Sequence, residues 1–264
     1  MRRLFIVLAF LILINIVWNV FLFVNPDKQT PYNFLFNASY GLILTFGSLV
    51  AFLGARRHAG SPVAKSLVFY ALGLMSYAVG LFIWTFYNLV LQVEIPYPGV
   101  SDIFFVLFQP LAALAFFYLV KSAGGEFTTR SKVELVVIFV FLFAMLYSLL
   151  LKGGLEEELP LLTRILNLGY PAFDAFLAAL AITGIRTEKG TLHPNLLVFA
   201  FAALIMTFAD TTFSYRSAQG TYWNGDMADT LYLISSSLFA LAITLLVTSL
   251  KDRSPETPYS NILT

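Results

Sequence analysis

The chain has 264 residues, of which 59% are apolar and only 12% are charged, and its mean hydropathy is +0.81. A soluble domain carries about 25% charged residues, so this composition excludes a soluble enzyme and a disordered regulator. The net charge of +1 offers no basic surface for nucleic acid, and the absence of cysteine excludes disulfides and thiolate chemistry. We therefore predict an all-α polytopic integral membrane protein that forms a single transmembrane domain over residues 1–264.

Eight mostly apolar stretches follow one another along the chain, each with about the 20 residues needed to cross the hydrocarbon core. The predicted spans are 4–24, 33–54, 66–91, 102–120, 133–151, 165–185, 195–215 and 228–250. The first span follows Arg2 and Arg3 as the core of a signal peptide would. It is longer than such a core and no A-x-A cleavage site follows it, so we predict a retained helix.

Lysine and arginine positions predict the orientation, because cytoplasmic loops carry an excess of these residues. With the N-terminus inside, twelve of the 16 basic residues fall in inner segments. The four in outer segments are Lys28, Lys152, Arg164 and Arg216. This asymmetry predicts a multi-pass protein of the cell membrane with both termini in the cytoplasm, residues 251–264 being a short cytoplasmic tail.

The two halves of the chain contain similar stretches. The sequence S-D-I-F-F-V-L-F-Q-P-L-A-A-L-A around Asp102 resembles A-D-T-L-Y-L-I-S-S-S-L-F-A-L-A around Asp229. A slightly larger shift along the chain pairs Gly54 with Gly184. Because four spans return the chain to its starting side, such a duplication is a parallel repeat. The predicted four-helix repeats are residues 1–125 and 126–250.

Two carboxylates lie inside predicted spans, where a charge is costly and usually faces a cavity or a partner. Asp174 lies about nine residues into the sixth span, and Asp210 lies about five residues from the outer end of the seventh, which are depths of about 13 Å and 8 Å. Both positions fall in the outer half of the membrane. The alternative role for each is a structural hydrogen bond to a neighbouring helix.

Asp102 and Asp229 stand at the starts of the fourth and eighth spans, where an aspartate can cap a helix or can line the mouth of a cavity. Nearby aromatic residues can line the same cavity or can anchor the helices at the membrane interface. From these observations we predict an outward-facing cavity for a small-molecule or lipid ligand between the repeats. Its predicted ligand-binding residues are Asp174, Asp210, Trp84, Tyr87, Asp102, Tyr215, Asp229 and Tyr232.

The sequence contains no recognisable catalytic motif. H-E-x-x-H, G-x-S-x-G, a Walker loop and an Asp-rich metal motif are all missing from it. The acidic run at residues 156–158 is typical of a solvated loop. We therefore predict no catalytic residues, no metal site and no cofactor, and we expect a protein without enzymatic activity.

The stretch E-I-P-Y-P-G-V-S-D-I-F-F-V-L-F-Q-P-L resembles part of the multi-span sensor modules that precede diguanylate cyclase (GGDEF) or histidine kinase domains in bacterial proteins. The residues that match the pattern are Pro96, Pro98, Asp102 and Pro110. The resemblance implies a receptor-like module over nearly the whole chain. An output domain does not fit in the residues after Lys251, so the expected partner is a separate cytoplasmic or membrane output protein.

These observations favour a stand-alone membrane sensor or ligand-binding module that signals in trans. Ligand binding in the outer half would shift the helices and alter the predicted inner loops. The first alternative is a transporter of small solutes or lipids that is coupled to protons, since acids inside spans suit proton transfer. The second is an intramembrane lipid hydrolase of the lysoplasmalogenase type, which would use acids from several helices.

Overall fold

The computed structural model describes residues 2–93, 95–152, 159–187 and 193–251, and every regular element in them is a helix. Eight of these helices are long and apolar enough to cross a membrane, which confirms the eight predicted spans. They are α1 (Arg2–Val24), α2 (Pro31–Arg57), α3 (Pro62–Phe86), α4 (Val100–Ser122), α5 (Thr129–Lys152), α6 (Leu161–Thr187), α7 (His193–Ala218) and α8 (Met227–Lys251). A π-helical turn, η1 (Tyr87–Leu91), continues α3. Glu94, the acidic run and the tail after Lys251 lie outside the described residues.

Local sequence sets several helix ends. Helix α3 begins after Ser61, whose hydroxyl accepts a hydrogen bond from the backbone N–H of Ala64 at 3.3 Å, and proline occupies the first helical position. Helix α4 ends where Gly124 adopts a φ of +82°, a conformation that favours glycine. The backbone N–H of Gly125 then donates to the carbonyl of Val120 at 2.9 Å and closes the helix end.

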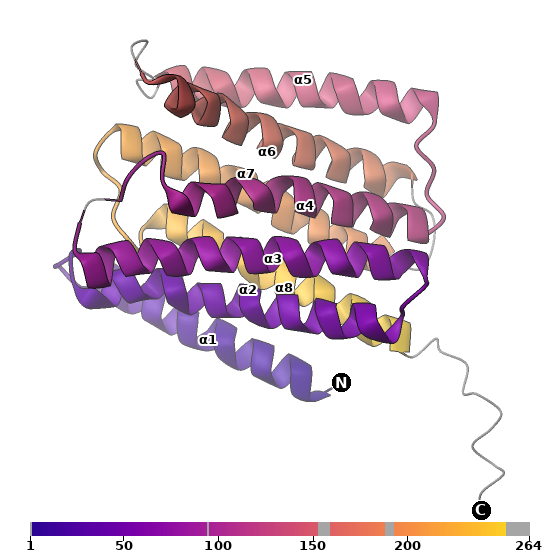
Figure 1. The fold of residues 1–264 in the computed structure, drawn as a ribbon, viewed down its shortest axis with the longest axis horizontal. Helices are drawn as coiled ribbons and strands as arrows, with labels where there is room; N and C mark the ends of the chain where they lie inside the picture. The colour runs from indigo at the N-terminus through magenta and orange to yellow at the C-terminus, as the bar shows by residue number, and fades with distance from the viewer. Residues whose placement is uncertain (1, 94, 153–158, 188–192, 252–264) are drawn as a thin grey trace, which may run out of the picture.

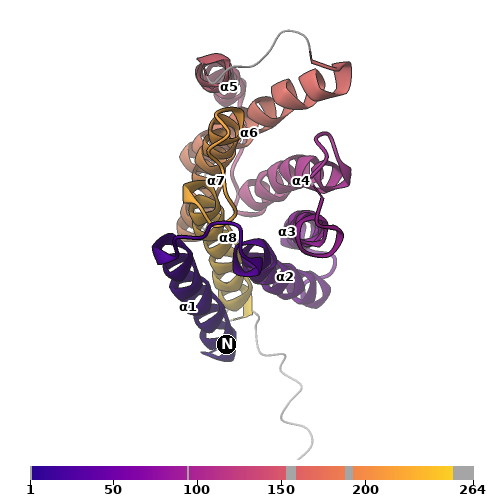
Figure 2. The same ribbon diagram turned by 90° about the vertical axis from the view of Figure 1, so that its left-hand side faces the viewer.

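Six helices make a closed circuit of contacts. Helices α2, α3 and α4 pack in sequence, α4 packs on α6, α6 on α7, α7 on α8, and α8 returns to α2. Viewed along the bundle, α2, α3 and α4 stack beside the layer that holds α6, α7 and α8 (Figure 2). Helix α1 packs on α2 and α8, and α5 packs on α6 and α7, so these two helices flank the bundle (Figure 1). Only 17% of the α1 span and 6% of the α5 span are buried, so most of their apolar surface is not covered by the rest of the described chain.

A column of aromatic rings fills the space between the two layers. Phe116 stacks on Phe199 with ring centroids 4.8 Å apart, and Phe199 meets Phe239 at 5.2 Å. Phe239 contacts Phe108 at 5.5 Å, and Phe108 contacts Tyr77 at 5.2 Å. Each such pair adds about 0.5–1.5 kcal/mol beyond simple burial. The column joins helices of both layers and leads to the polar residues described below.

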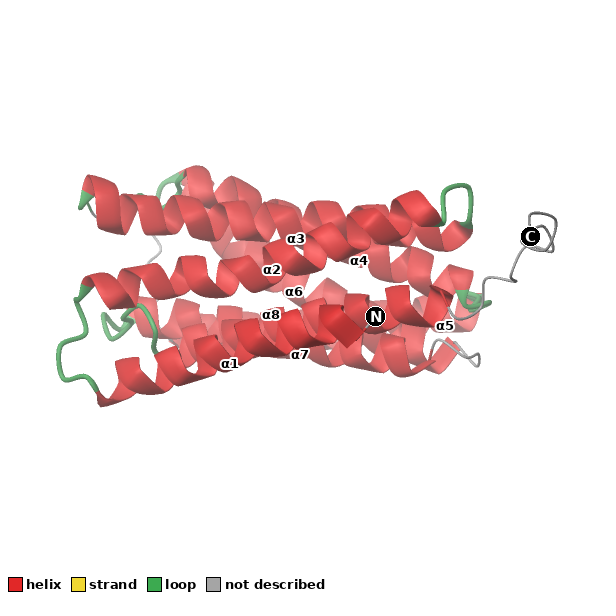
Figure 3. Cartoon of the chain, turned by 90° about the horizontal axis from the view of Figure 1, so that it is seen from below, coloured by secondary structure: helices red, strands yellow, loops and turns green. Residues whose placement is uncertain are grey.

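The loops gather at the two ends of the bundle (Figure 3). One end carries the loops 25–30, 92–99 and 219–226, and we call it the predicted outer end. The other carries the loops 58–61 and 123–128, and we call it the predicted inner end. The first helix begins and the last helix ends at this second end, as expected for eight helices that alternate in direction (Figure 1).

Candidate functional site

A buried and a partly buried carboxyl group, from different helices, meet at one amide in the interior of the bundle. The Nε2 atom of Gln109 in α4 donates to Asp174 Oδ1 in α6 at 2.6 Å and to Asp210 Oδ2 in α7 at 3.3 Å. The Tyr232 hydroxyl of α8 donates to Asp210 Oδ1 at 2.6 Å. Asp174 and Gln109 are each 2% exposed. We call these residues, Gln109, Asp174, Asp210 and Tyr232, the carboxyl pair cluster.

The depth of this cluster follows from where its helices begin. Helix α6 starts at Leu161, four residues earlier than the predicted span, so Asp174 occupies the middle of a 27-residue helix. Asp174 therefore lies about 20 Å along α6 rather than about 13 Å. Pro171 lies one turn earlier in the same helix, and α6 continues through it. In a membrane-spanning helix, the middle is the position at which an unpartnered charge is most costly.

A second set of buried polar groups surrounds Asp229 at the start of α8. Asp229 accepts hydrogen bonds from the Tyr40 hydroxyl at 3.0 Å, the Tyr222 hydroxyl at 3.0 Å and the backbone N–H of Gly225 at 2.6 Å. Burial, together with the charges of Asp229 and Asp226, raises the pKa of the Tyr222 phenol well above its usual value. Tyr222 therefore remains a protonated donor to this carboxylate.

Asn224 links the Asp229 region to helices α2 and α3. Its Oδ1 accepts from the indole N–H of Trp84 at 2.9 Å and from Asn37 Nδ2 at 3.0 Å. Its backbone carbonyl accepts from Asn33 Nδ2 at 2.9 Å. The loop between α7 and α8 is therefore held inside the predicted outer end by side chains of these two helices, and Trp84 acts here as a hydrogen-bond donor.

Asp102 occupies a comparable place at the start of α4. It accepts from the backbone N–H of Gly99 at 2.7 Å and from the Tyr170 hydroxyl at 2.8 Å. Nearby, the Tyr97 hydroxyl donates to Asn167 Oδ1 at 2.6 Å, and burial together with Asp102 raises the pKa of this phenol. The backbone bonds of Asp102 and Asp229 are those of helix caps, and the phenols are additional partners.

The carboxyl groups inside the bundle lack basic partners. The ion pairs among the described residues join Arg186 to Glu134 and Arg216 to Asp226. Within this part of the chain, neither Asp174, Asp210 nor Asp229 is paired with a lysine, arginine or histidine. Buried charges in proteins are normally paired or bound to a ligand, so this acidic region is left with uncompensated negative charge unless protons or cations bind.

The structure brings together most of the predicted ligand-binding residues, in three groups. Asp174, Asp210 and Tyr232 share the carboxyl pair cluster, Asp229 and Trp84 meet through the residues around Asn224, and Asp102 pairs with Tyr170. Tyr87 begins η1 and Tyr215 is 48% exposed. Among the described contacts, the side chains of these two residues make no hydrogen bond to the three groups.

Sequence reasoning missed the residues that connect these groups. Gln109 lies beside Pro110 in an apolar span. Like Asp174, it could have been selected as a polar side chain inside a predicted span. Tyr40 and Tyr170 carry no such signal, because a tyrosine in a span is usually an interfacial anchor. Their role depends on helices that meet only in the folded chain.

Among the described residues, no group of three or more histidine, cysteine, aspartate or glutamate side chains is arranged to hold a metal ion. The carboxyl pair cluster instead presents two acids, an amide and a phenol. Comparisons with protein-family models, with curated proteins and with solved structures found no match for this chain. The resemblance to sensor modules therefore stays a prediction, and the function has to be argued from the site.

Proposed function

We propose that this chain is an integral membrane sensor or ligand-binding module whose signal is a proton or a small organic cation bound at the carboxyl pair cluster. One observation carries the proposal. Asp174 and Asp210 both accept from the amide nitrogen of Gln109 inside a helical bundle, without a basic partner among the described residues. An ionisable residue at such depth marks a functional site by default.

The groups around the carboxyl pair favour a ligand that donates hydrogen bonds. Besides the carboxyl oxygens, the Oε1 atom of Gln109 is buried without a hydrogen-bond partner. The Tyr77 ring lies 6.1 Å from the ring of Tyr232, the residue that donates to Asp210, and the Tyr77 hydroxyl makes no hydrogen bond to a described residue. A proton or an ammonium group complements this set of acceptors, whereas an anion would be repelled.

Charge repulsion supplies a mechanism for the response. Two carboxylates held close together in a water-poor site repel each other, and one shared proton removes that repulsion. Binding of a proton or a cation would therefore hold α6 against α7 at this depth, and its release would let them separate. The same helices, with α4, lead to the predicted inner loops, including residues 121–132. A signal of this kind requires a ligand that binds the two arrangements with different affinity.

The carboxyl pair also favours a second function, a transporter of small solutes or lipids coupled to protons. Acids inside transmembrane bundles serve as proton relays in transporters. Transport requires that the pair be reached from both sides of the membrane in turn, which a sensor does not need. A flux measurement therefore separates the two functions.

We further propose that the bundle consists of two parallel four-helix repeats, and contacts at the predicted outer end support this. The Tyr40 hydroxyl donates to Asp229, and the Tyr170 hydroxyl donates to Asp102. The shift that relates the two tyrosines is the one that pairs Gly54 with Gly184, and the two aspartates are the pair that first indicated the duplication. Each tyrosine thus reaches the matching aspartate of the other half.

Further matching pairs support the same repeat. The rings of Trp84 and Phe105 have centroids 6.4 Å apart at 56°, and those of Phe213 and Tyr232 have centroids 6.5 Å apart at 55°. At the predicted inner end, a Cβ at Gly54 would meet Val247, and a Cβ at Gly184 would meet Val120. In each case, the two residues of one pair correspond to the two residues of the other pair. The correspondence follows the shifts along the chain that relate the two halves, to within one position.

The proposal is tested with the purified protein in lipid nanodiscs, by infrared difference spectroscopy during a pH titration. We expect a carboxyl band that responds to pH and that disappears in Asp174→Asn and in Asp210→Asn. Asp27→Asn, which changes an exposed aspartate in the loop 25–30, is the matched control and should keep the band. Methylammonium and ammonium should raise the unfolding temperature of the wild type but not of the two interior variants.

The proposal is overturned if neither protons nor these cations act through Asp174 or Asp210. Proton flux in proteoliposomes that is abolished by Asp210→Asn would assign the transporter function. Binding without flux would assign the sensor function.

A further inference from the structure

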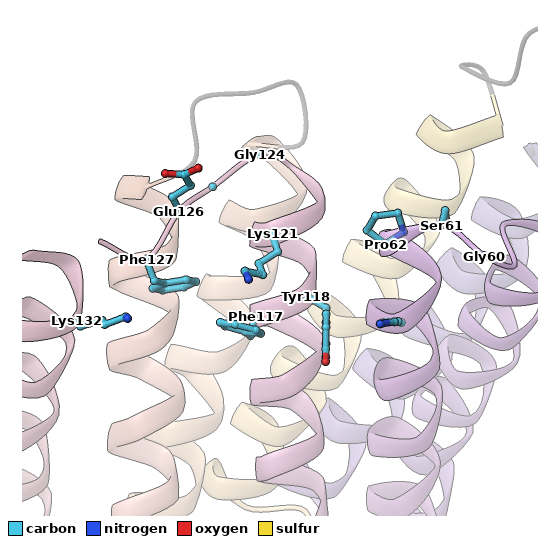
Figure 4. Close-up of a pocket in the computed structure, with 12 residues that line it drawn as sticks. Gly60, Ser61, Pro62, Phe117, Tyr118, Lys121, Gly124, Glu126, Phe127 and Lys132 are labelled. Atoms are coloured by element: carbon cyan, nitrogen blue, oxygen red, sulfur yellow. The ribbon is translucent and has the colours of Figure 1, made fainter. Parts of the chain in front are cut away.

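A pocket of about 820 Å³ opens at the predicted inner end of the bundle (Figure 4), and no residue of the carboxyl pair cluster lines it. It lies between the start of α3, the end of α4 and the loop that leads into α5. The closed helix end at Gly124 and Gly125 shapes one of its walls. The proposed function does not use this pocket.

The lining of the pocket is basic. Lys65, Lys121 and Lys132 come from three different helices, and Glu126 is the acidic residue among the lining side chains. None of the three lysines forms an ion pair with a described residue. Three unpaired ammonium groups around one pocket create a positive potential that an anion relieves.

Aromatic rings form the floor beneath the lysines. Phe117 stacks on Phe127 with centroids 5.4 Å apart, and Lys121 Nζ lies 5.4 Å from the centroid of the Phe117 ring. Lys65 Nζ lies 5.6 Å from the centroid of the Tyr118 ring. The rings hold the ammonium groups by cation–π attraction without neutralising them. An apolar floor with charged groups above it matches the boundary between acyl chains and headgroups.

The backbone adds to this positive character. Helix α3 begins at Pro62, which lines the pocket, so the positive end of its dipole faces the same region as the lysines. The Ser61 hydroxyl is already engaged, because it donates to the carbonyl of His58 at 2.6 Å. The lysines therefore carry most of the attraction, and the helix end supplements them.

The fold itself does not require this set of residues. Under the proposed repeat, the shift that takes Asp102 to Asp229 also matches Lys121 with Thr248 and Tyr118 with Leu245. Thr248 donates its hydroxyl to the carbonyl of Thr244 at 2.8 Å within α8, so the matching position is satisfied without a charge. Lys121 and Tyr118 are thus an addition to the first half of the bundle, and Phe127 and Lys132 join them from the start of the second half.

We propose that this pocket binds a phosphate-bearing anion, namely the headgroup of an anionic phospholipid. Basic pockets between transmembrane helices bind such headgroups. The lysines would contact the phosphate, and Phe117 and Tyr118 would contact the glycerol and the first acyl carbons. The same phosphate chemistry also occurs in soluble anions, so the test below includes both sources.

The test compares lipids on the full chain in nanodiscs. Phosphatidylglycerol added to phosphatidylcholine nanodiscs should bind at one site, measured by native mass spectrometry and by the rise in unfolding temperature. Because a lysine near the headgroups contributes about 1 kcal/mol, each Lys→Gln change should weaken binding roughly fivefold, and the triple variant Lys65→Gln, Lys121→Gln, Lys132→Gln roughly 100-fold. Inorganic phosphate in phosphatidylcholine nanodiscs is the second arm.

The matched control changes three other basic residues at the same end of the bundle, Arg2→Gln, Arg3→Gln and Arg57→Gln. Phosphatidylglycerol binding that is lost in the lysine variant and kept in this control supports the lipid site. Stabilisation by inorganic phosphate alone, with the same dependence on the lysines, keeps the anion site and assigns it to a soluble ligand. Equal loss in the two variants, or no binding in the wild type, overturns the proposal. The unfolding temperature in pure phosphatidylcholine shows that each variant is folded.

Discussion

At the scale of single residues, a few buried polar atoms of this protein have no hydrogen-bond partner. Among the described residues, the buried side-chain atoms without a partner are Asn15 Oδ1, Asn37 Oδ1, Ser101 Oγ, Gln109 Oε1 and Thr183 Oγ1. A buried polar atom without a partner costs about 1–3 kcal/mol, so each one needs a reason. For Gln109 the reason is geometric, since its amide nitrogen is directed at the two carboxyl groups and its oxygen is left free for a donor.

Replacing Gln109 by leucine should destabilise the protein through the acids that it leaves behind. Gln109→Leu keeps the approximate volume but removes the donor shared by Asp174 and Asp210. We expect a loss of about 1–3 kcal/mol in the free energy of unfolding, measured by denaturant titration in detergent micelles. Gln29→Leu, at an exposed position in the loop 25–30, should change it by less than about 0.5 kcal/mol. A stability of Gln109→Leu equal to that of the wild type would show that the amide does not support the pair.

At the scale of helices, hydropathy predicted every span, but it placed the starts of several helices a few residues too late in the chain. Helix α6 starts at Leu161 and not at residue 165, and α3 starts at Pro62 and not at residue 66. Helical residues near the ends are polar or capped, and a count of apolar residues stops before it reaches them. The Ser61 cap followed by proline was a readable signal that the hydropathy count did not use.

The sequence predicted only those residues of the candidate site whose presence in a span has a free-energy cost whatever their neighbours are. Asp174 and Asp210 stand out because acids are rare in spans. The hydrogen bond from Tyr40 to Asp229 joins residues 189 positions apart, and no local sequence pattern predicts it. The duplication in the sequence contained that information, because it matches Tyr40 with Tyr170 at the same shift as Gly54 with Gly184.

Close approach of helices at two glycines provides a test of the repeat. A Cβ added at Gly54 would lie 2.6 Å from Val247, and one added at Gly184 would lie 2.4 Å from Phe116. Gly54→Ala and Gly184→Ala should therefore each lower the free energy of unfolding by about 1–3 kcal/mol, since inserted carbons force the helices apart. Similar losses at both positions are expected if the α2–α8 and α4–α6 contacts are equivalent.

Gly169 in α6 is the control for this comparison, because a Cβ there would have no atom within 4 Å. Gly169→Ala should stabilise the helix by about 0.5–1 kcal/mol through its better helix propensity. If Gly54→Ala and Gly184→Ala behave like Gly169→Ala, the close packing at the predicted inner end is wrong.

At the scale of the whole molecule, the two ends of the bundle differ in how their basic residues are used. At the predicted outer end, Lys28 Nζ donates to the carbonyl oxygens of Leu22 at 2.7 Å and Asn25 at 2.5 Å, and Arg216 pairs with Asp226 at 2.5 Å. At the predicted inner end, Lys65 and Lys121 form no ion pair with a described residue. Arg186, near the predicted inner end, is paired with Glu134 as well, so the predicted orientation rests on the count of basic residues rather than on their pairing.

Cysteine labelling tests this orientation directly, because the native chain contains no cysteine. Asp27→Cys lies in the loop 25–30 and Ala59→Cys in the loop 58–61, and both positions are exposed at opposite ends of the bundle. A membrane-impermeant maleimide applied to intact cells should label Asp27→Cys and leave Ala59→Cys unlabelled, whereas both should react after permeabilisation. The reverse pattern would place the carboxyl pair nearer the cytoplasm and the lysine pocket outside. Since anionic lipids are concentrated in the cytoplasmic leaflet, the expected pattern also places the pocket beside its proposed ligand.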